Sequence, residues 1–235
     1  MAQISVCMAS YNGGQFIRQQ LYSILSQLAD NDEIIVSDDG STDNTVQIIQ
    51  HIADPRIKVY LNKGRHGPIG NFENALQHSS GQFIFLADQD DIWLPKKVEV
   101  ISTLLIESDL ILADCEVIDQ QGNILYPSFF AYRGSRRGFW ANLYRNSYIG
   151  CCMAFRREVL AYALPFPVQI HMHDWWIGLL VEAKGRVTLY DKPLIKYVRH
   201  GGNASPTGET TGNSFSKQIV NRFFLLWNVT KRLLM

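Results

Sequence analysis

Short apolar runs alternate with amphipathic stretches through the first 115 residues of the chain. The apolar runs predict four buried strands, at Ile4–Ala9, Glu33–Ser37, Ile57–Leu61 and Phe83–Ala87. Between them apolar residues recur every three or four positions, which predicts helices over about 16–28, 43–52 and 70–78 and a further helix with Pro95 at its first position. Strands that alternate with helices predict β-α-β units and a mostly parallel sheet, so the fold class is α/β.

The second half of the chain has a less regular pattern. Four elements are predicted: a loop over Tyr132–Arg145, a strand over Tyr148–Phe155, a helix over Asp174–Lys184 and a short strand over Val187–Tyr190. Residues 201–214 are rich in Gly, Ser, Thr and Asn, which predicts a mobile loop. Residues 217–235 are apolar and basic together.

Composition adds exclusions rather than a function. The 235 residues include 22 basic and 22 acidic side chains, so there is no basic excess of the kind that nucleic-acid binding needs. None of the four cysteines forms a C-x-x-C pair, which favours free buried thiols in a reducing compartment. The chain enters a strand at once and holds no apolar run of ~18 residues, so we expect a cytoplasmic protein without a signal peptide or a membrane span.

Polar residues follow three of the four predicted strands. They are Ala9-Ser10-Tyr11-Asn12-Gly13, Asp38-Asp39-Gly40-Ser41 and Asp88-Gln89-Asp90-Asp91. Ligands of parallel α/β sheets bind beyond the carboxyl ends of the strands, so these groups should converge on one site.

The run from Asp88 to Asp91 indicates a bound cation. Three carboxylates within four residues repel one another, and a divalent cation such as Mg²⁺ or Mn²⁺ takes one or two carboxylates together with substrate phosphates. The alternative is a capping turn for the helix near Pro95. Asp91 suits that capping role better, which leaves Asp88 and Asp90 for the metal. At the other strand ends, Asp39 either binds a nucleotide or belongs to a turn, and Tyr11 either stacks on a base or lines the core.

Three runs resemble the family 2 glycosyltransferases: S-V-C-M-A-S-Y-N-G at 5–13, I-I-V-S-D-D-G-S-T-D-N-T at 34–45 and F-L-A-D-Q-D-D-I-W-L-P at 85–95. The resemblance implies the GT-A fold, a Rossmann-like α/β domain. Residues 1–115 would form its donor-binding half, 116–205 its acceptor-binding and catalytic half, and 206–235 a mobile loop and a C-terminal amphipathic helix. It also implies that Tyr11 and Asp39 contact the nucleotide base, that Ala9 and Ser10 shape its pocket, that Asp88 lies near the ribose or the metal, and that Asp90 binds the metal.

The resemblance extends more loosely into the second half. The string H-M-H-D-W-W at 171–176 lies where this family places its catalytic base, which implies that Asp174 is the base, with a helix N-cap as the alternative. His200, in K-Y-V-R-H-G-G-N at 196–203, would complete the metal site or contact the diphosphate, or would be a surface histidine. Asn71 would reach the donor or cap its helix. In motif detail the chain is most similar to bacterial rhamnosyltransferases, which implies dTDP-β-L-rhamnose as the donor.

The implied function is an inverting, metal-dependent glycosyltransferase of bacterial surface polysaccharide synthesis. The acceptor would be a saccharide or a lipid-linked saccharide, and the donor a dTDP- or UDP-sugar. The Arg-rich and aromatic stretch at 132–145 either meets an acceptor phosphate or is a solvated surface. The C-terminal run at 222–235 either lies in a membrane interface, as in a peripheral enzyme at the inner face of the cell membrane, or packs on the domain. A sugar nucleotidyltransferase and a non-catalytic nucleotide-sugar-binding protein are the rival interpretations.

Overall fold

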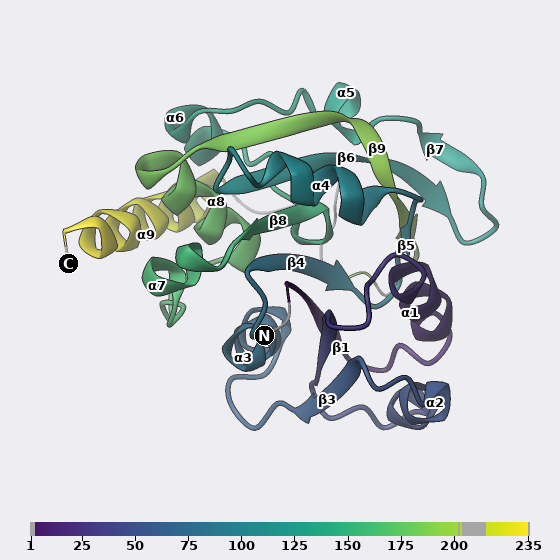
Figure 1. The fold of residues 1–235 in the computed structure, drawn as a ribbon. Helices are drawn as coiled ribbons and strands as arrows, with labels where there is room; N and C mark the ends of the chain where they lie inside the picture. The colour runs from purple at the N-terminus through teal and green to yellow at the C-terminus, as the bar shows by residue number, and fades with distance from the viewer. Residues whose placement is uncertain (1–2, 202, 204–214, 235) are drawn as a thin grey trace.

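One nine-stranded sheet organises the protein in a computed structural model that describes residues 3–201, 203 and 215–234 (Figure 1). The strands run in the order β3-β2-β1-β4-β8-β6-β9-β5, and β7 pairs with β6. Their bounds are β1 (Ile4–Ser10), β2 (Glu33–Asp38), β3 (Ile57–Leu61), β4 (Phe83–Asp88), β5 (Ile92–Trp93), β6 (Leu110–Asp119), β7 (Ile124–Tyr126), β8 (Met153–Arg156) and β9 (Val187–Arg199).

Helices cover the sheet and connect its strands. The α-helices are α1 (Ile17–Leu25), α2 (Thr45–Ile52), α3 (Pro68–His78), α4 (Lys97–Leu104), α5 (Phe129–Arg133), α6 (Phe139–Tyr144), α7 (Leu160–Ala163), α8 (His173–Lys184) and α9 (Phe215–Leu233), and the 3-10 turns are η1 (Gly150–Cys152) and η2 (Arg157–Val159). Figure 1 shows α3 on the opposite side of β1 from α1 and α2. No helix in the described ranges is both long and apolar enough to cross a membrane.

The first half forms a parallel sheet because its strands are apolar on both faces. β1, β2 and β4 are almost wholly buried, whereas β3, at the edge, has only half-buried and exposed positions. Strands buried on both faces need helices on both sides, and each β-α-β connection supplies one. β1 pairs in parallel with both β2 and β4, which puts the ends of these three strands at one edge of the sheet.

The second half joins this sheet through one short antiparallel strand. β8 pairs with β4 on one side and with β6 on the other, so Phe155 lies opposite both Ile84 and Leu110. β9 then runs parallel to β6, with register shifts near Asp114, and pairs with β5. β5 follows residues 88–91, which we call the acidic turn. Buried apolar residues of both halves form one continuous core.

The structure confirms the predicted α/β class. It also confirms the four early strands and the helices predicted over 70–78 and 174–184, each to within two residues at both ends. The prediction for 132–145 is wrong, because α5 and α6 occupy much of that stretch. The strand predicted over 148–155 is also wrong before Met153, because residues 150–152 form η1 and β8 begins only at Met153. β9 is far longer than the four residues predicted. β6 was not predicted, and the helix after Pro95 begins only at Lys97. Residues 202 and 204–214 of the predicted loop lie outside the described residues. The division at residue 115 stays a prediction.

Candidate functional site

The three polar strand ends meet as predicted. In the sheet register Ser10 lies beside Asp38, and Ala9 lies beside Asp88. The Ser10 hydroxyl donates a hydrogen bond of 2.9 Å to the Asp38 carboxylate, which joins the first two strand ends directly. Ser10 and Asp38 are both buried, whereas Tyr11, one residue further on, is 55% exposed. Tyr11 thus offers an open aromatic face at the edge of the sheet.

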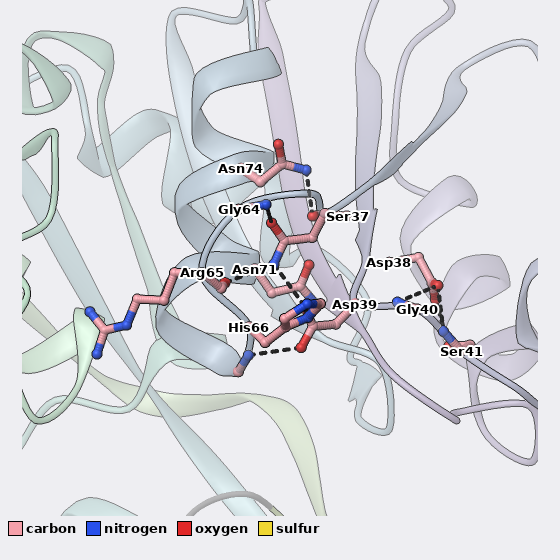
Figure 2. Close-up of polar contacts among 12 residues, drawn as sticks. Ser37, Asp38, Asp39, Gly40, Ser41, Gly64, Arg65, His66, Asn71 and Asn74 are labelled. Atoms are coloured by element: carbon pink, nitrogen blue, oxygen red, sulfur yellow. Dashed lines mark hydrogen bonds and ion pairs between the residues drawn. The ribbon is translucent and has the colours of Figure 1, made fainter.

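Asp38 and Asp39 are neighbours in sequence but serve different parts of the structure. Asp38 accepts hydrogen bonds from the backbone amides of Gly40 and Ser41, at 3.1 and 2.8 Å, so it holds the turn after β2 (Figure 2). Gly40 has a φ of 86°, a backbone conformation that favours glycine at this turn.

Asp39 points instead to the loop between β3 and α3. Its carboxylate accepts hydrogen bonds from Asn62 at 2.7 Å and from the Gly67 amide at 2.8 Å, and it lies 2.9 Å from His66 Nδ1. Figure 2 shows His66 lying against this carboxylate. Asp39 therefore ties the 62–67 loop to the strand end, and its contact with a nucleotide base stays a prediction. Asn62 and His66 were not predicted, because nothing in their local pattern sets them apart.

Asn71 lies at the site and does not cap its helix. Gly67 is the N-cap residue of α3, so the capping alternative is wrong. The Asn71 amide donates a hydrogen bond of 3.0 Å to the carbonyl of Ser10. Its own oxygen is buried and has no hydrogen-bond partner among the described residues. A buried oxygen without a hydrogen-bond partner lowers the stability of the fold. This oxygen is therefore a candidate to accept a hydrogen bond from a hydroxyl group of the bound nucleotide sugar.

Gln89, which lies between Asp88 and Asp90, connects the acidic turn to the residues that follow β1. Its side chain accepts a hydrogen bond from the Tyr11 amide at 2.9 Å and donates one to the Tyr11 carbonyl at 3.0 Å. Gly13 makes the approach possible, because a Cβ there would lie 2.0 Å from the Gln89 oxygen. Gln89 was not predicted, since the D-x-D pattern leaves its middle position unspecified.

Asp90 and His200 are brought together from 110 positions apart. His200 Nε2 lies 2.7 Å from the Asp90 carboxylate, and both side chains are about 10% exposed. The His200 ring stacks on Phe16 at 4.7 Å, and Asn203 binds the His200 amide and reaches Asp90 at 3.4 Å. The structure thus places a late histidine at the acidic turn, and it excludes the surface alternative for His200.

Asp88 lies in an unfavourable environment for a negative charge. Burial is the main cause that raises its pKa to about 7, and the neighbouring charges of Asp90 and Asp174 raise it further. The charge of Lys97 lowers the pKa of Asp88 slightly. Lys97 is buried and donates a hydrogen bond of 2.9 Å to the Cys151 carbonyl. Burial lowers the pKa of Lys97 to about 8. This lysine was not predicted.

The predicted capping role of Asp91 is wrong. α4 begins six residues later, and its N-cap residue is Lys96. The Asp91 carboxylate is buried and accepts a hydrogen bond from the Val198 amide in β9 at 3.2 Å. Burial holds the pKa of Asp91 well above its usual range, and its second oxygen has no hydrogen-bond partner among the described residues. Asp91 therefore anchors the acidic turn to β9.

The donor atoms at this turn fit a hard divalent cation. Burial raises the pKa of Asp88 most, and repulsion by neighbouring carboxylates raises it further; a cation would offset that repulsion. Asp90 presents a carboxylate beside the imidazole of His200. Asp88, Asp91 and Cys151 also place one ligand atom each within 4.8 Å of one another. The thiol in that second group suits softer metals than Mg²⁺. Asp90 and His200 are in contact, whereas Asp88 belongs to the second group, so the predicted metal set of Asp88, Asp90 and His200 stays a prediction.

Asp174 lies in the first turn of α8, buried at 6% exposure. The N-cap residue of α8 is Met172, so the capping alternative is wrong. The carboxylate accepts a hydrogen bond from the Trp175 amide at 2.6 Å. Burial raises the pKa of Asp174 to about 7, and its charge in turn raises the pKa of Asp88. A carboxyl group with this pKa, near the acidic turn, can take up a proton at neutral pH.

His173 and Gly150 form the wall beside Asp174. His173 stacks on Phe72 at 4.1 Å, and burial lowers its pKa to about 3, so it is neutral. A Cβ on Gly150 would lie 2.9 Å from His173 Nε2 and 3.9 Å from the Asp174 Cβ. Gly150 therefore allows α8 and η1 to pack closely at the carboxylate. His173 was not predicted as part of the site.

Comparison with known proteins gives a consistent family. The family described as "Glycosyl transferase family 2" matches residues 5–163. A UDP-Glc:α-D-GlcNAc-diphosphoundecaprenol β-1,3-glucosyltransferase of Escherichia coli is 30% identical over 183 residues, which cover 76% of this chain and 69% of that protein. A GalNAc(5)-diNAcBac-PP-undecaprenol β-1,3-glucosyltransferase of Campylobacter jejuni is 34% identical over 131 residues, which cover 53% of this chain and 41% of that protein.

Solved structures share the fold at low sequence identity. S. aureus TarS 1-349 in complex with UDP-GlcNAc has a TM-score of 0.72 and 19% identity, and the match covers 100% of this chain and 67% of that one. The mannosyltransferase PcManGT from Pyrobaculum calidifontis, in complex with GDP-Man and Mn²⁺, has a TM-score of 0.60 and 18% identity over 99% of this chain and 64% of that one. These likenesses confirm the predicted GT-A fold.

Proposed function

Because the chain belongs to glycosyl transferase family 2, we propose that it is an inverting, metal-dependent enzyme that transfers a hexose from a nucleoside diphosphate sugar to a lipid-linked saccharide. The observation that carries the proposal is the proximity of Asp174 to the acidic turn. Asp174 is a buried carboxyl group with a pKa of about 7, and its negative charge raises the pKa of Asp88. A proton acceptor and a candidate cation site therefore belong to one site.

The residues divide between donor and acceptor. Tyr11 offers an exposed ring on which a base can stack, and Asn71 has an oxygen that lacks a partner among the described residues. Asp90 and His200 would hold the metal, with Asp88 as a further ligand or a ribose contact. A bound divalent metal would supply positive charge to the leaving nucleoside diphosphate.

Asp174 would act on the acceptor. Its carboxylate takes the proton from an acceptor hydroxyl as that oxygen attacks the anomeric carbon, and the bond to the nucleoside diphosphate breaks on the opposite face. A single base implies inversion, since retaining glycosidases use a second, closely spaced carboxylate as nucleophile. The neutral His173 adds no positive charge that would weaken Asp174 as a base.

The donor sugar and the acceptor are the finer parts of the proposal. The similarity to rhamnosyltransferases supports dTDP-β-L-rhamnose, whereas the relatives of E. coli and C. jejuni carry the names of glucosyltransferases. Both names include a diphosphoundecaprenol-linked saccharide, which supports an acceptor of that class for bacterial polysaccharide synthesis. Such an acceptor would bring the enzyme to the membrane surface.

A donor screen tests the proposal. The protein is incubated with dTDP-β-L-rhamnose, UDP-Glc, UDP-GlcNAc or GDP-Man, with Mn²⁺, Mg²⁺ or a chelator, and with GlcNAc linked through a diphosphate to a polyprenol. Release of nucleoside diphosphate and the anomeric configuration of the product are measured. We expect one donor to be used, only with metal, and with inversion. Absence of both binding and turnover with every donor would overturn the proposal, and retention would overturn the single-base mechanism.

A further inference from the structure

The C-terminal helix α9 presents two different faces. Leu225 and Val229 are buried where α9 packs against α8. Arg232 fixes the far end of the helix, since its guanidinium donates hydrogen bonds to the carbonyls of Leu164 and Pro165, at 2.8 and 2.6 Å. The orientation of α9 about its axis is therefore set by the core.

The opposite face of α9 is apolar and exposed. Ile219, Phe223 and Trp227 follow one another at intervals of four residues, which places them in one row along the helix. Phe223 is 63% exposed and Trp227 is 62% exposed. Large apolar residues in a row on a surface are unusual for a face in contact with water alone.

α6 extends this row with two more aromatic residues. Trp140 and Tyr144 are each more than 70% exposed, and α6 packs beside α9. The contact is direct, because Arg222 of α9 donates hydrogen bonds of 3.0 and 2.7 Å to the Tyr144 carbonyl and lies over the Tyr144 ring at 5.6 Å. We call the exposed side chains of Trp140, Tyr144, Ile219, Phe223 and Trp227 the aromatic face.

The two chain segments that carry the aromatic face contain basic residues and no acidic ones. Residues 120–155 and 215–234 contain eight of the 22 basic residues and none of the 22 acidic residues. The remaining chain therefore has an excess of eight acidic residues. Arg136, Arg137, Arg145 and Lys231 of these segments are exposed. The two segments that carry the aromatic face thus have a net positive charge, which attracts anions, whereas the rest of the chain has a net negative charge.

We propose that the aromatic face docks the enzyme on an anionic lipid bilayer. Tryptophan and tyrosine concentrate at the interface between water and hydrocarbon, and helices with an apolar face and basic neighbours lie in that plane. Arginine and lysine near the face bind the anionic headgroups. The inference rests on the proposed function in one respect: a polyprenol-linked acceptor is itself held in a bilayer. Docking would hold the enzyme at the surface where that acceptor is found.

Vesicle binding tests the proposal without using catalysis. The protein is mixed with vesicles of phosphatidylethanolamine and phosphatidylglycerol that contain neither acceptor nor donor, and the bound fraction is measured by sedimentation. Emission of Trp140 and Trp227 should shift to shorter wavelength, and acrylamide should quench it less. The remaining three tryptophans are buried and should contribute no change. Vesicles of phosphatidylcholine alone should bind more weakly.

Two sets of variants locate the docking face. The double variant Phe223→Ser with Trp227→Ser should weaken vesicle binding by at least about tenfold, because these two apolar side chains no longer enter the membrane interface. Tyr22→Ser is the matched control, an exposed aromatic residue on α1, which lies on the other side of the molecule from α9 (Figure 1). Arg145→Gln/Lys231→Gln should weaken binding to anionic vesicles by about 25-fold, from about fivefold for each charge. Arg18→Gln on α1 should have no effect.

The outcomes separate docking from the proposed function. Vesicle binding that is absent, or that the aromatic and charge variants leave unchanged, would overturn the docking proposal. So would a dimer in solution whose formation requires Phe223 and Trp227, because a second copy would then cover the face. Transfer to an acceptor in detergent by a protein that binds no vesicles would reject docking alone. Vesicle binding by a protein that uses no sugar nucleotide would reject the proposed function alone.

Discussion

Replacing Asp174 with Asn separates the chemistry of this carboxylate from its structural role. The Asn side chain keeps an oxygen that can accept the hydrogen bond now made by the Trp175 amide at 2.6 Å, so α8 should start as before. It cannot take a proton from an acceptor hydroxyl. We therefore expect the rate of transfer to fall by about 10²- to 10⁴-fold, the usual contribution of a general base. Donor binding should stay within about twofold.

The same substitution should stabilise the protein at neutral pH. Burial raises the pKa of Asp174 from 3.8 to about 7, so ionising this group in the folded protein costs up to about 4 kcal/mol. The folded protein keeps the proton after the unfolded chain has lost it. The free energy of unfolding of the wild type therefore falls as pH rises from about 4 to about 7, and above that range the cost is constant. The Asp174→Asn variant carries no such cost, because its amide does not ionise.

Denaturant unfolding at several pH values measures this difference. The variant should be more stable than the wild type by about 2 kcal/mol at pH 5 and by up to about 4 kcal/mol at pH 8. Asp191→Asn is the control, because it removes one carboxylate from an exposed position in β9. The wild-type rate of transfer should rise with pH to a plateau above about 7. A stability difference independent of pH, or transfer that survives in Asp174→Asn, would refute the assignment of Asp174 as a buried base.

Three further substitutions test the parts around this carboxylate. Gly150→Ala places a methyl group 2.9 Å from His173 Nε2. We expect kcat to fall at least about tenfold and the free energy of unfolding to fall by about 1–3 kcal/mol, with little change in donor KM. An unchanged kcat would mean that the contact between Gly150 and His173 does not position the base. Gln89→Ala removes both hydrogen bonds to Tyr11, and donor KM should rise about tenfold in steady-state assays, whereas an unaltered KM would remove Gln89 from the donor site. Asp90→Ala should abolish the Mn²⁺ dependence of donor binding in calorimetry, and retained dependence would move the metal elsewhere.

The early part of the fold could be read from the sequence because each strand and helix carries its own periodicity. β1, β2 and β4 are apolar on both faces, and a parallel strand of this kind needs no partner to be recognised. The second half lacks such patterns. β9 is interrupted by Asp191, Lys192 and Pro193, and only pairing with β6 across its register shifts keeps these residues in one strand. The Arg-rich stretch at 132–145 forms helices because α6 packs on α8, which no local signal reports.

The candidate site likewise contains residues that local sequence patterns predict and residues that only packing brings together. Polar residues after β1, β2 and β4 follow from strand order alone, because parallel strands bring their carboxyl ends to one edge. The capping role expected for Asp91 and the capping alternatives for Asn71 and Asp174 were wrong for a common reason. Each helix begins one to six residues away from the residue in question, and the packing of the preceding loop sets that start. A sequence pattern shows that a helix is near but not where its first turn closes.

The sequence by itself determined the α/β class, the family and the three polar strand ends. Those features depend on residues close together in the chain, whose periodicity and spacing are visible without coordinates. Only the tertiary structure decided that His200 meets Asp90 across 110 residues, that Gln89 fastens the acidic turn to Tyr11, and that burial gives Asp174 a pKa of about 7. The physical reason is that distance and desolvation depend on which segments pack together, and that packing is a property of the whole chain.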